Sequence, residues 1–404
     1  MRPPTRNPKS FVLSLSASVL IGGASAFGQA PAAEELGPDA LVSLSPGLDL
    51  SHDPAIAAAE GRALAAWSGL GESRQTVYFA LWAEGSAWSA PLPADPTPDG
   101  TGSQAAVAFA PDGTPAVAWV ETQPGGGVRL LLSRGSLGAA EPVEVAASAN
   151  AIESPALAFF PSGQPVLAWA EGNGATYRVI VGMPYDGTSY ENAEWYTMCL
   201  TQGNAPYDIL PTLIGGEVPL IHWYSLSGEE FRIQSATLDP NGDWLPLYFD
   251  DLQGLPTNRL PILYGTGEAS ASTSGLWSTG AIWVSMDDGG MESVMAFDPR
   301  TAENGGGNLT LALPGPAEAR QTDPDAASGT LVPAWAWREE NGGRSDILLQ
   351  TGPRRVQVSG VPYVAQPRLA ADPAGGLHLV FVSDQIDGGT GDVYWTYVAP
   401  QVGQ

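Results

Sequence analysis

The stretch Pro155–Trp169 reads PALAFFPSGQPVLAW, and two close copies stand earlier in the chain, PAIAAAEGRALAAW at Pro54–Trp67 and AAVAFAPDGTPAVAW at Ala105–Trp119. Each copy has a short apolar run, a turn that contains glycine, and a second apolar run that ends in tryptophan. Two short apolar runs joined in this way are typical of two antiparallel β-strands. In all three copies the glycine stands six residues before the tryptophan, so the phrase is a structural repeat.

Looser copies of the phrase continue toward the C-terminus, at Leu210–Trp223, Leu260–Trp283, Asp323–Trp337 and Pro367–Phe381. The aromatic residues that end successive copies are 52, 50, 54, 60, 54 and 44 residues apart. Seven units of roughly fifty residues are the sequence signature of a β-propeller with four strands in each blade.

Each unit also contains a third and a fourth strand. After the tryptophan comes a loop rich in glycine and acidic residues, then a β-rich run such as TVYFALW at Thr76–Trp82, and then a short outer strand such as Pro142–Ala146. The last unit reaches only its third strand, whereas Ala40–Ser45 (ALVSLS) precedes the first unit and is typical of an outer strand. We therefore expect an all-β fold, a seven-bladed β-propeller with four-stranded antiparallel blades, closed by the N-terminal strand.

The N-terminus has the pattern of a secretory signal peptide. Arg2, Arg6 and Lys9 precede an apolar run, Phe11–Ile21, and small residues follow at Ala24–Ala26. The apolar run is shorter than the roughly 20 residues that a transmembrane helix needs, although an uncleaved membrane anchor is the alternative. We expect a signal peptide at 1–26, a linker at 27–39 and the propeller at 40–404, in a secreted or periplasmic bacterial protein.

The charge of the chain excludes several classes of function. The net charge is −26, and cleavage after Ala26 removes three of the 17 cations and no acid, which leaves 14 arginines against 43 acids and a net charge of −29. Lys9 is the only lysine, so chemistry that needs a lysine in the mature chain is excluded. Nucleic acid and anionic membranes need a basic surface, so we expect neither nucleic-acid binding nor membrane insertion, and we expect a monomer.

Cys199 is the only cysteine of the chain. An intramolecular disulfide and a cluster of thiolate ligands for a metal are therefore both excluded. Stability must come from a hydrophobic core, and the 44% hydrophobic content is sufficient for one.

The repeats resemble a known family. The phrase P-x-h-A-x-x-x-x-G-x-x-h-x-h-W, followed by a run such as Asp392–Trp395 (DVYW), resembles the sialidase-like, BNR-type repeats of bacterial secreted propellers. Sialidases also carry Asp boxes, S-x-D-x-G-x-x-x-W, between the third and fourth strands. Here Asp239–Trp244 (DPNGDW) holds that turn in degenerate form, and Ser285–Gly289 (SMDDG) follows a second strand instead. Sialidases are six-bladed, so the resemblance implies the fold without the sialidase activity.

The loops that lead into the innermost strand of each blade lie nearest to the propeller axis, where ligands usually bind. Arg259, Arg320 and Arg368 come from three consecutive blades, and arginine forks suit planar carboxylate or sulfate groups. The acidic residues could accept hydrogen bonds from sugar hydroxyls, or the opposite charges could simply pair with one another. The candidate ligand-binding residues of this axial mouth are His52, Asp53, Glu153, Tyr207, Asp208, Arg259, Arg320, Asp323 and Arg368.

The loops between the second and third strands are acidic, with Glu121, Glu171, Glu339 and Glu340 among their residues. Acidic oxygens beside glycine could bind Ca²⁺, but no loop has the D-x-[DN]-x-[DN]-G pattern, so we favour a solvated rim and assign no cofactor or metal.

His222 and His378 stand in second strands, where a packed histidine is expected, whereas His52 stands in a loop near the axis. A histidine there would suit the general base of a polysaccharide lyase. No G-x-S-x-G elbow or phosphate loop is present, so no catalytic residue is assigned.

Three functions are consistent with these observations. We favour an exported, non-catalytic binding propeller that recognises a glycan or a protein. The first alternative is a carbohydrate-active enzyme, either a glycoside hydrolase or a polysaccharide lyase, with an axial site. The second is a scaffold for envelope or extracellular proteins. Two carboxyl groups about 5–10 Å apart at the axis would favour the enzyme, and axial charges that all pair would favour the scaffold.

Overall fold

The fold of the described chain is all-β. The computed structural model describes residues 33–46, 48–71, 74–174, 176–184, 193–201, 208–214, 219–227, 230–238, 243–247, 262–265, 279–286, 291–297, 310–313, 318–327, 333–361, 363–384 and 391–400. Within these residues the strands form seven sheets, six of four strands and one of five.

Within the first four sheets, the strands follow chain order from the innermost to the outermost. Their bounds are β3 (Asp49–Ala59), β4 (Arg62–Leu70), β5 (Gln75–Ala83) and β6 (Leu92–Pro93); β7 (Thr101–Phe109), β8 (Pro115–Thr122), β9 (Val128–Arg134) and β10 (Val143–Ser148); β11 (Ala151–Phe159), β12 (Pro165–Gly172), β13 (Tyr177–Pro184) and β14 (Trp195–Cys199); β15 (Asp208–Ile214), β16 (Leu220–Ser227), β17 (Glu230–Leu238) and β18 (Trp244–Leu247).

The last three sheets continue the same order, and their pairing within each group below is antiparallel. Their bounds are β19 (Ile262–Gly265), β20 (Thr279–Met286), β21 (Glu292–Phe297) and β22 (Thr310–Ala312); β23 (Arg320–Ala327), β24 (Ala334–Asn341), β25 (Arg344–Thr351) and β26 (Arg354–Val358); β27 (Tyr363–Ala371), β28 (Leu377–Asp384) and β29 (Asp392–Val398).

The N-terminal segment joins the last two sheets. Strand β2 (Val42–Ser43) pairs with β29 in antiparallel register and supplies the fourth strand of the seventh sheet. Strand β1 (Glu34–Leu36) pairs in parallel with β26 as a fifth strand of the sixth sheet. The 3₁₀ helix η1 (Pro38–Ala40) connects β1 to β2. Residues 34–36, which the sequence analysis placed in a linker, are therefore part of a sheet.

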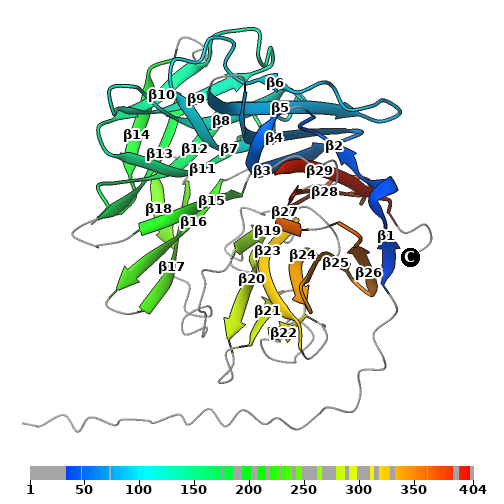
Figure 1. Ribbon diagram of the computed structural model, residues 1–404. Helices are drawn as coiled ribbons and strands as arrows, with labels where there is room; N and C mark the ends of the chain where they lie inside the picture. Colours follow the sequence, from blue (N-terminus) through cyan, green and yellow to red (C-terminus); the bar gives the residue numbers. More distant parts are fainter. Residues whose placement is uncertain are drawn as a thin grey trace, which may run out of the picture.

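The sheets are arranged around a common centre, as in a β-propeller. Figure 1 shows β3, β7, β11, β15, β19, β23 and β27 nearest to this centre, with the later strands of each sheet farther out. Innermost strands of consecutive sheets lie side by side, and β27 of the seventh sheet lies beside β3 of the first.

Five of the seven aromatic residues that end the repeats are the largest fully buried side chains among the described residues. Trp67, Trp119, Trp169, Trp337 and Phe381 are all fully buried. Four of them pack against the preceding sheet, as Trp119 does against Leu64 and Val77. The interpretation of these residues as packing between sheets is confirmed.

The same relation holds between the first and the last sheets. Trp67, on β4, packs in one cluster with Val380, Val393 and Trp395 of the seventh sheet. Phe381 in turn packs with Ile347 and other residues of the sixth sheet. The hydrophobic core therefore passes from the last sheet to the first without a change in the packing pattern.

A β-bulge recurs in the innermost strands, opposite the buried aromatic residue. In β3, for example, His52 pairs with Ser68 and Ala55 with Ala66, so two residues face Trp67 alone. One residue of the bulge has a positive φ near 50° in six sheets: Asp53, Gln104, Ser154, Leu210, Asp323 and Gln366. A bulge bends the strand and changes the direction of its side chains, so the repeat itself sets how one side chain is oriented in each of these six sheets.

Local sequence explains how the bulge is tolerated. The residue after the bulged one is proline in five of these sheets, as at Pro54 and Pro367. Proline has no N–H, so no donor is left unpaired where the ladder is interrupted. In two sheets a glutamine side chain accepts a hydrogen bond from the bulged residue of the next sheet. Gln366 Oε1 accepts from the Asp53 N–H at 2.9 Å, and Gln104 Oε1 accepts from the Ser154 N–H at 2.6 Å.

The join between β2 and β29 gives a stability prediction. Ser45 Oγ accepts a hydrogen bond from the buried Val393 N–H at 2.9 Å, so Ser45→Ala leaves that donor unpaired and should destabilise the protein by about 1–3 kcal/mol. The matched control is Ser43→Ala, because the Ser43 hydroxyl is buried without a hydrogen-bond partner among the described residues. Chemical denaturation of both variants is the measurement. An equal effect of the two substitutions would contradict the role assigned to Ser45.

Candidate functional site

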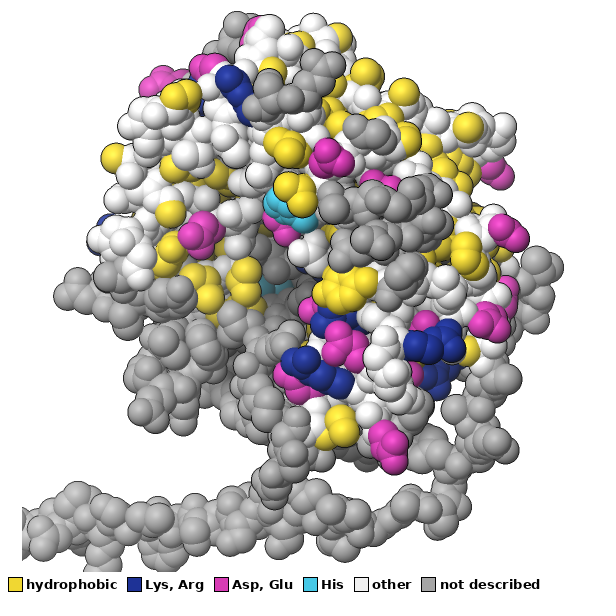
Figure 2. All heavy atoms as spheres, viewed as in Figure 1, with side chains coloured by type: hydrophobic (Ala, Val, Ile, Leu, Met, Phe, Trp, Pro, Cys, Tyr) yellow, Lys and Arg dark blue, Asp and Glu magenta, His cyan; other side chains and the backbone are white. Residues whose placement is uncertain are grey.

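The axial mouth is the end of the sheets at which the innermost strands begin and the second strands finish. Figure 2 shows that this face is hollowed near its centre, with histidine, acidic and arginine side chains around the hollow. His52 and Asp53 lie in β3, Glu153 in β11, Arg320 and Asp323 in β23, and Arg368 in β27. Asp208 is the first residue of β15, and only its backbone is described. Tyr207 and Arg259 lie outside the described residues.

These residues belong to strands, whereas the sequence analysis placed them in loops. The innermost strands begin before the apolar run of the repeat, because the polar residues that precede the bulge still pair with the second strand. The polar residues are therefore held by backbone pairing on both sides of the bulge. This makes the mouth a more rigid surface than a set of loops would be.

His52 and Asp53 form a pair at the junction of the first and seventh sheets. His52 Nδ1 lies 2.8 Å from Asp53 Oδ2, and His52 Nε2 lies 3.1 Å from Gln75 Nε2. Gln366 of the seventh sheet donates to Asp53 Oδ1 at 3.4 Å while its own oxygen holds the Asp53 N–H. Both ring nitrogens of His52 are thus engaged, and the pair is fixed from two sheets.

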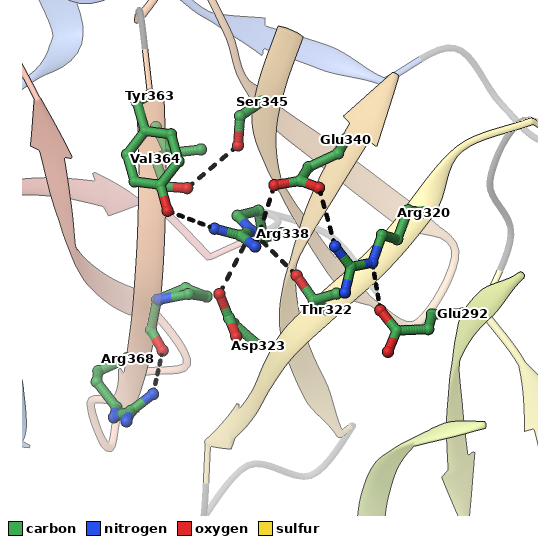
Figure 3. Close-up of polar contacts among 11 residues, drawn as sticks. Glu292, Arg320, Thr322, Asp323, Arg338, Glu340, Ser345, Tyr363, Val364 and Arg368 are labelled. Atoms are coloured by element: carbon green, nitrogen blue, oxygen red, sulfur yellow. Dashed lines mark hydrogen bonds and ion pairs between the residues drawn. The ribbon is translucent and has the colours of Figure 1, made fainter. Parts of the chain in front are cut away.

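The second polar group of the mouth centres on Arg338, in β24. Its Nε donates to Thr322 Oγ1 at 3.0 Å and lies 3.3 Å from Asp323 Oδ2, and its Nη2 lies 3.1 Å from Glu340 Oε1. Figure 3 shows these groups converging on the guanidinium from β23 and β24.

Tyr363, at the start of β27, completes this group. Its hydroxyl accepts a hydrogen bond from Arg338 Nη1 at 2.9 Å, and the Arg338 guanidinium carbon lies 5.6 Å from the centre of the tyrosine ring. Because Tyr363 is 41% exposed, it offers an aromatic side chain at the mouth, and its contacts with Arg338 set the orientation of that side chain.

Arg320 is the third member of the group, and it is neutralised rather than free. Its Nε bonds Glu292, and its Nη1 lies 3.6 Å from Glu340 Oε2. Two arginines, Arg320 and Arg338, therefore face three carboxylates, Glu292, Asp323 and Glu340, and the charge of this cluster is 2 − 3 = −1.

The expected convergence of arginines does not occur for the two that are described. Arg320 pairs in register with Glu340, three residues after Trp337, whereas Arg368 pairs with Val380, one residue before Phe381. Four residues of strand therefore separate their levels, about 13 Å at the usual rise per residue. Figure 3 shows Arg368 pointing away from Arg320, and its Nη1 donates to the carbonyl of Pro367 at 2.9 Å.

Arg368 has instead a carboxylate at its own level in the sixth sheet. Asp325, which pairs with Ala336, occupies the position in β23 that Arg368 occupies in β27. Its Oδ2 accepts a hydrogen bond from the Leu369 N–H at 2.7 Å. Burial raises the pKa of Asp325 to about 6, while the charge of Arg368 acts in the opposite direction. Asp325 thus joins β23 to β27 below the mouth.

The remaining predicted residues have structural partners. Glu153 accepts a hydrogen bond from Tyr177 Oη at 2.9 Å within the third sheet. His222 and His378 are buried, as expected for packed residues, and burial lowers their pKa values to about 3 and about 4. His52 is the only histidine of the three that lies at the mouth.

Sequence reasoning missed Gln75, Arg338, Tyr363 and Gln366. The repeat frame contained a signal for one of them, because Gln366 stands at the position of Asp53, Gln104 and Asp323, immediately before the small or proline residue of the phrase. Arg338 follows an apolar run and Tyr363 precedes one, and neither residue is part of the periodic pattern of the repeats.

Two further observations concern only the part of the chain that the structure describes. This part of the chain contains no group of three or more histidine, cysteine, aspartate or glutamate residues that could hold a metal ion. It also contains no helix long and apolar enough to cross a membrane.

The comparisons with known proteins concern the fold. No family model and no curated protein matches the sequence. A protein of unknown function from Dyadobacter fermentans has 10% identity and a TM-score of 0.47, over 89% of this chain and 98% of the other. An α-L-arabinofuranosidase from Fusarium graminearum, in complex with an iminosugar inhibitor, has 12% identity and a TM-score of 0.45, over 75% and 95% of the two chains.

Sialidases are among the structural neighbours. The sialidase of Trypanosoma rangeli, in complex with the inhibitor DANA, has 10% identity and a TM-score of 0.42, over 89% of this chain and 58% of that one. The expected resemblance to sialidase-like proteins is thus confirmed as a structural likeness. Likeness at this level says nothing of activity, so the chemistry of the mouth rests on its own residues.

The His52–Asp53 pair predicts a pH dependence of stability. Its hydrogen bond raises the pKa of His52 above 6.5 and lowers the pKa of Asp53 below 3.8. The histidine's contribution is complete below pH 6.5 and is lost as the pH rises through the raised pKa, while the aspartate's is complete above pH 3.8 and is lost on acidification.

The pair therefore stabilises the fold most between these two limits. His52→Gln should lower the melting temperature more at about pH 5.5 than at about pH 8.5. NMR titration of the wild-type protein should give a His52 pKa above 6.5. An equal loss at both pH values, together with an unshifted His52, would disprove the interaction.

Proposed function

We propose that the chain is an exported, non-catalytic binding protein, a single seven-bladed propeller closed by its N-terminal strand, which recognises a glycan at the axial mouth. Support for the closed ring comes from the core, because Trp67 packs on the seventh sheet in the way that Trp119 packs on the first. Pairing of β2 with β29 supports the same conclusion.

The observation that carries the binding function is the fixed, exposed ring of Tyr363. A hydrogen bond and a cation–π contact from Arg338 hold the ring, so little side-chain freedom is lost when a ligand packs on it. Asp323 and Glu340 contact the same guanidinium as the tyrosine and can accept hydrogen bonds from hydroxyl groups. An apolar surface bordered by a few fixed polar groups is the composition of small-ligand sites, and it suits the alternating apolar and hydroxyl-bearing surfaces of a sugar.

The polar contacts favour binding over catalysis. A general acid or base must be able to exchange a proton with the substrate. Asp323 and Glu340 are both bonded to one guanidinium, and both ring nitrogens of His52 are engaged. A proton transfer at any of these groups would have to break a contact that holds the mouth together.

The binding function is tested with Tyr363→Ala. Isothermal titration with glycans selected on an array should show at least a tenfold loss of affinity, about 1.4 kcal/mol, because the platform is removed. Tyr196→Ala is the matched control, since Tyr196 is 49% exposed but lies on the outer strand β14. Equal effects of the two substitutions would place the site elsewhere.

The same preparation separates the other functions. Release of reducing sugar from a bound glycan would show an enzyme and contradict the proposal. Capture of an envelope protein, without binding of any glycan, would show a scaffold and contradict it as well.

Export gives an independent prediction. The signal-like segment predicts cleavage after Ala26, so the protein recovered from the periplasm or the medium should begin at Phe27. N-terminal sequencing of the exported protein is the measurement, and a sequence that begins at Met1 would contradict cleavage.

A further inference from the structure

We infer that the glycan recognised at the axial mouth carries protonated amino groups, as in a polymer with free glucosamine-type residues. The inference rests on the proposed glycan-binding function and adds the chemical class of the ligand. It comes from the charges that the mouth presents to solvent around Tyr363.

The carboxylates of the mouth are more exposed than the arginine that they surround. The Arg338 side chain is 11% exposed, whereas those of Asp323 and Glu340 are 27% and 32% exposed. A ligand that approaches Tyr363 from this side therefore meets carboxylate oxygens, with the guanidinium beneath them. The fork of Arg338 is filled by protein groups and has no free edge to offer a carboxylate or sulfate.

Asp53 adds a further carboxylate to the mouth. It belongs to the first sheet and Asp323 to the sixth, and the seventh sheet, which carries Tyr363, lies between these two sheets. The Asp53 side chain is 44% exposed and is tied to the sheet of Tyr363 through Gln366. Two exposed cations of this face are matched by carboxylates: Arg320 by Glu292 and Glu340, and His52, when it is protonated, by Asp53.

This arrangement selects a cation. A protonated amine can bond an ionised carboxylate with a short, charge-assisted hydrogen bond, and it is attracted to the face of an aromatic ring. The net charge of −26 attracts cationic ligands at long range as well. An anionic sugar would have to displace a carboxylate from Arg320 or Arg338 before it could bind either of them.

The test compares two oligomers with one backbone. Titration of the mature protein with a β-1,4-glucosamine hexamer and with its fully N-acetylated form, at a mildly acidic pH where the amines are charged, isolates the charge. We expect at least tenfold tighter binding of the amine form, an advantage that falls as salt is added. Equal affinities, or tighter binding of the acetylated oligomer, would overturn the inference and leave the glycan-binding function standing.

Variants locate the effect. Asp323→Asn and Glu340→Gln, each checked for an unchanged melting temperature, should reduce the preference for the amine form. Glu60→Gln is the control, because it removes one charge from an exposed turn at the opposite end of the first sheet. An unchanged preference in both mouth variants would overturn the inference. Binding of neither oligomer, and of no other glycan, would contradict the proposed function itself, and binding of polylysine alone would assign the mouth to a basic protein.

Discussion

The packing of a buried aromatic side chain onto the neighbouring sheet, described in six of the seven sheets, is the constraint on which this structure depends. Each of these side chains lies on the second strand, so it fixes the distance and tilt of the neighbouring sheet at its centre. The first strand cannot run straight past so large a side chain, and its register shifts there by one residue. Core and bulge are thus two aspects of one contact.

The bulge transmits this constraint to the axial mouth. The bulged residue has a left-handed conformation, which costs a non-glycine residue about 1–2 kcal/mol. Where its side chain is aspartate or glutamine, it takes part in the polar network: Asp53, Gln104 and Gln366 contact a neighbouring sheet, and Asp323 contacts Arg338 of its own sheet. The positions of the polar groups are therefore consequences of the packing that makes the sheets.

Much of the fold was predictable from the sequence, because tryptophan and glycine recur at fixed spacing and the packing of a repeat is local. The pairing of β2 with the last sheet was also predictable, from a missing strand at one end of the chain and a spare one at the other. The parallel strand β1 (Glu34–Leu36) was not predictable, because a strand of three residues is too short to show an alternation of polar and apolar side chains.

The candidate site was predicted only in part, and the reason is the bulge. Counting residues before the apolar phrase placed Arg320 and Arg368 in one ring, but the two stand at different levels of their strands. The residues that neutralise Arg320 come from β21 and β24, which are distant in the sequence, so an inventory of arginines could not show that they were paired. Sequence reasoning found His52, Asp53 and Asp323 and missed their partners for the same reason.

The contact between the first and last sheets is of the same kind as the contacts between sheets that follow one another in the chain. Trp67 makes the closing contact and Trp169 a sequential one, and both are fully buried. The free energy of unfolding should therefore fall by a similar amount, about 3–5 kcal/mol, in Trp67→Ala and in Trp169→Ala, each in a single cooperative transition. A clearly smaller loss for Trp67→Ala, or separate unfolding of the first and last sheets, would contradict the account.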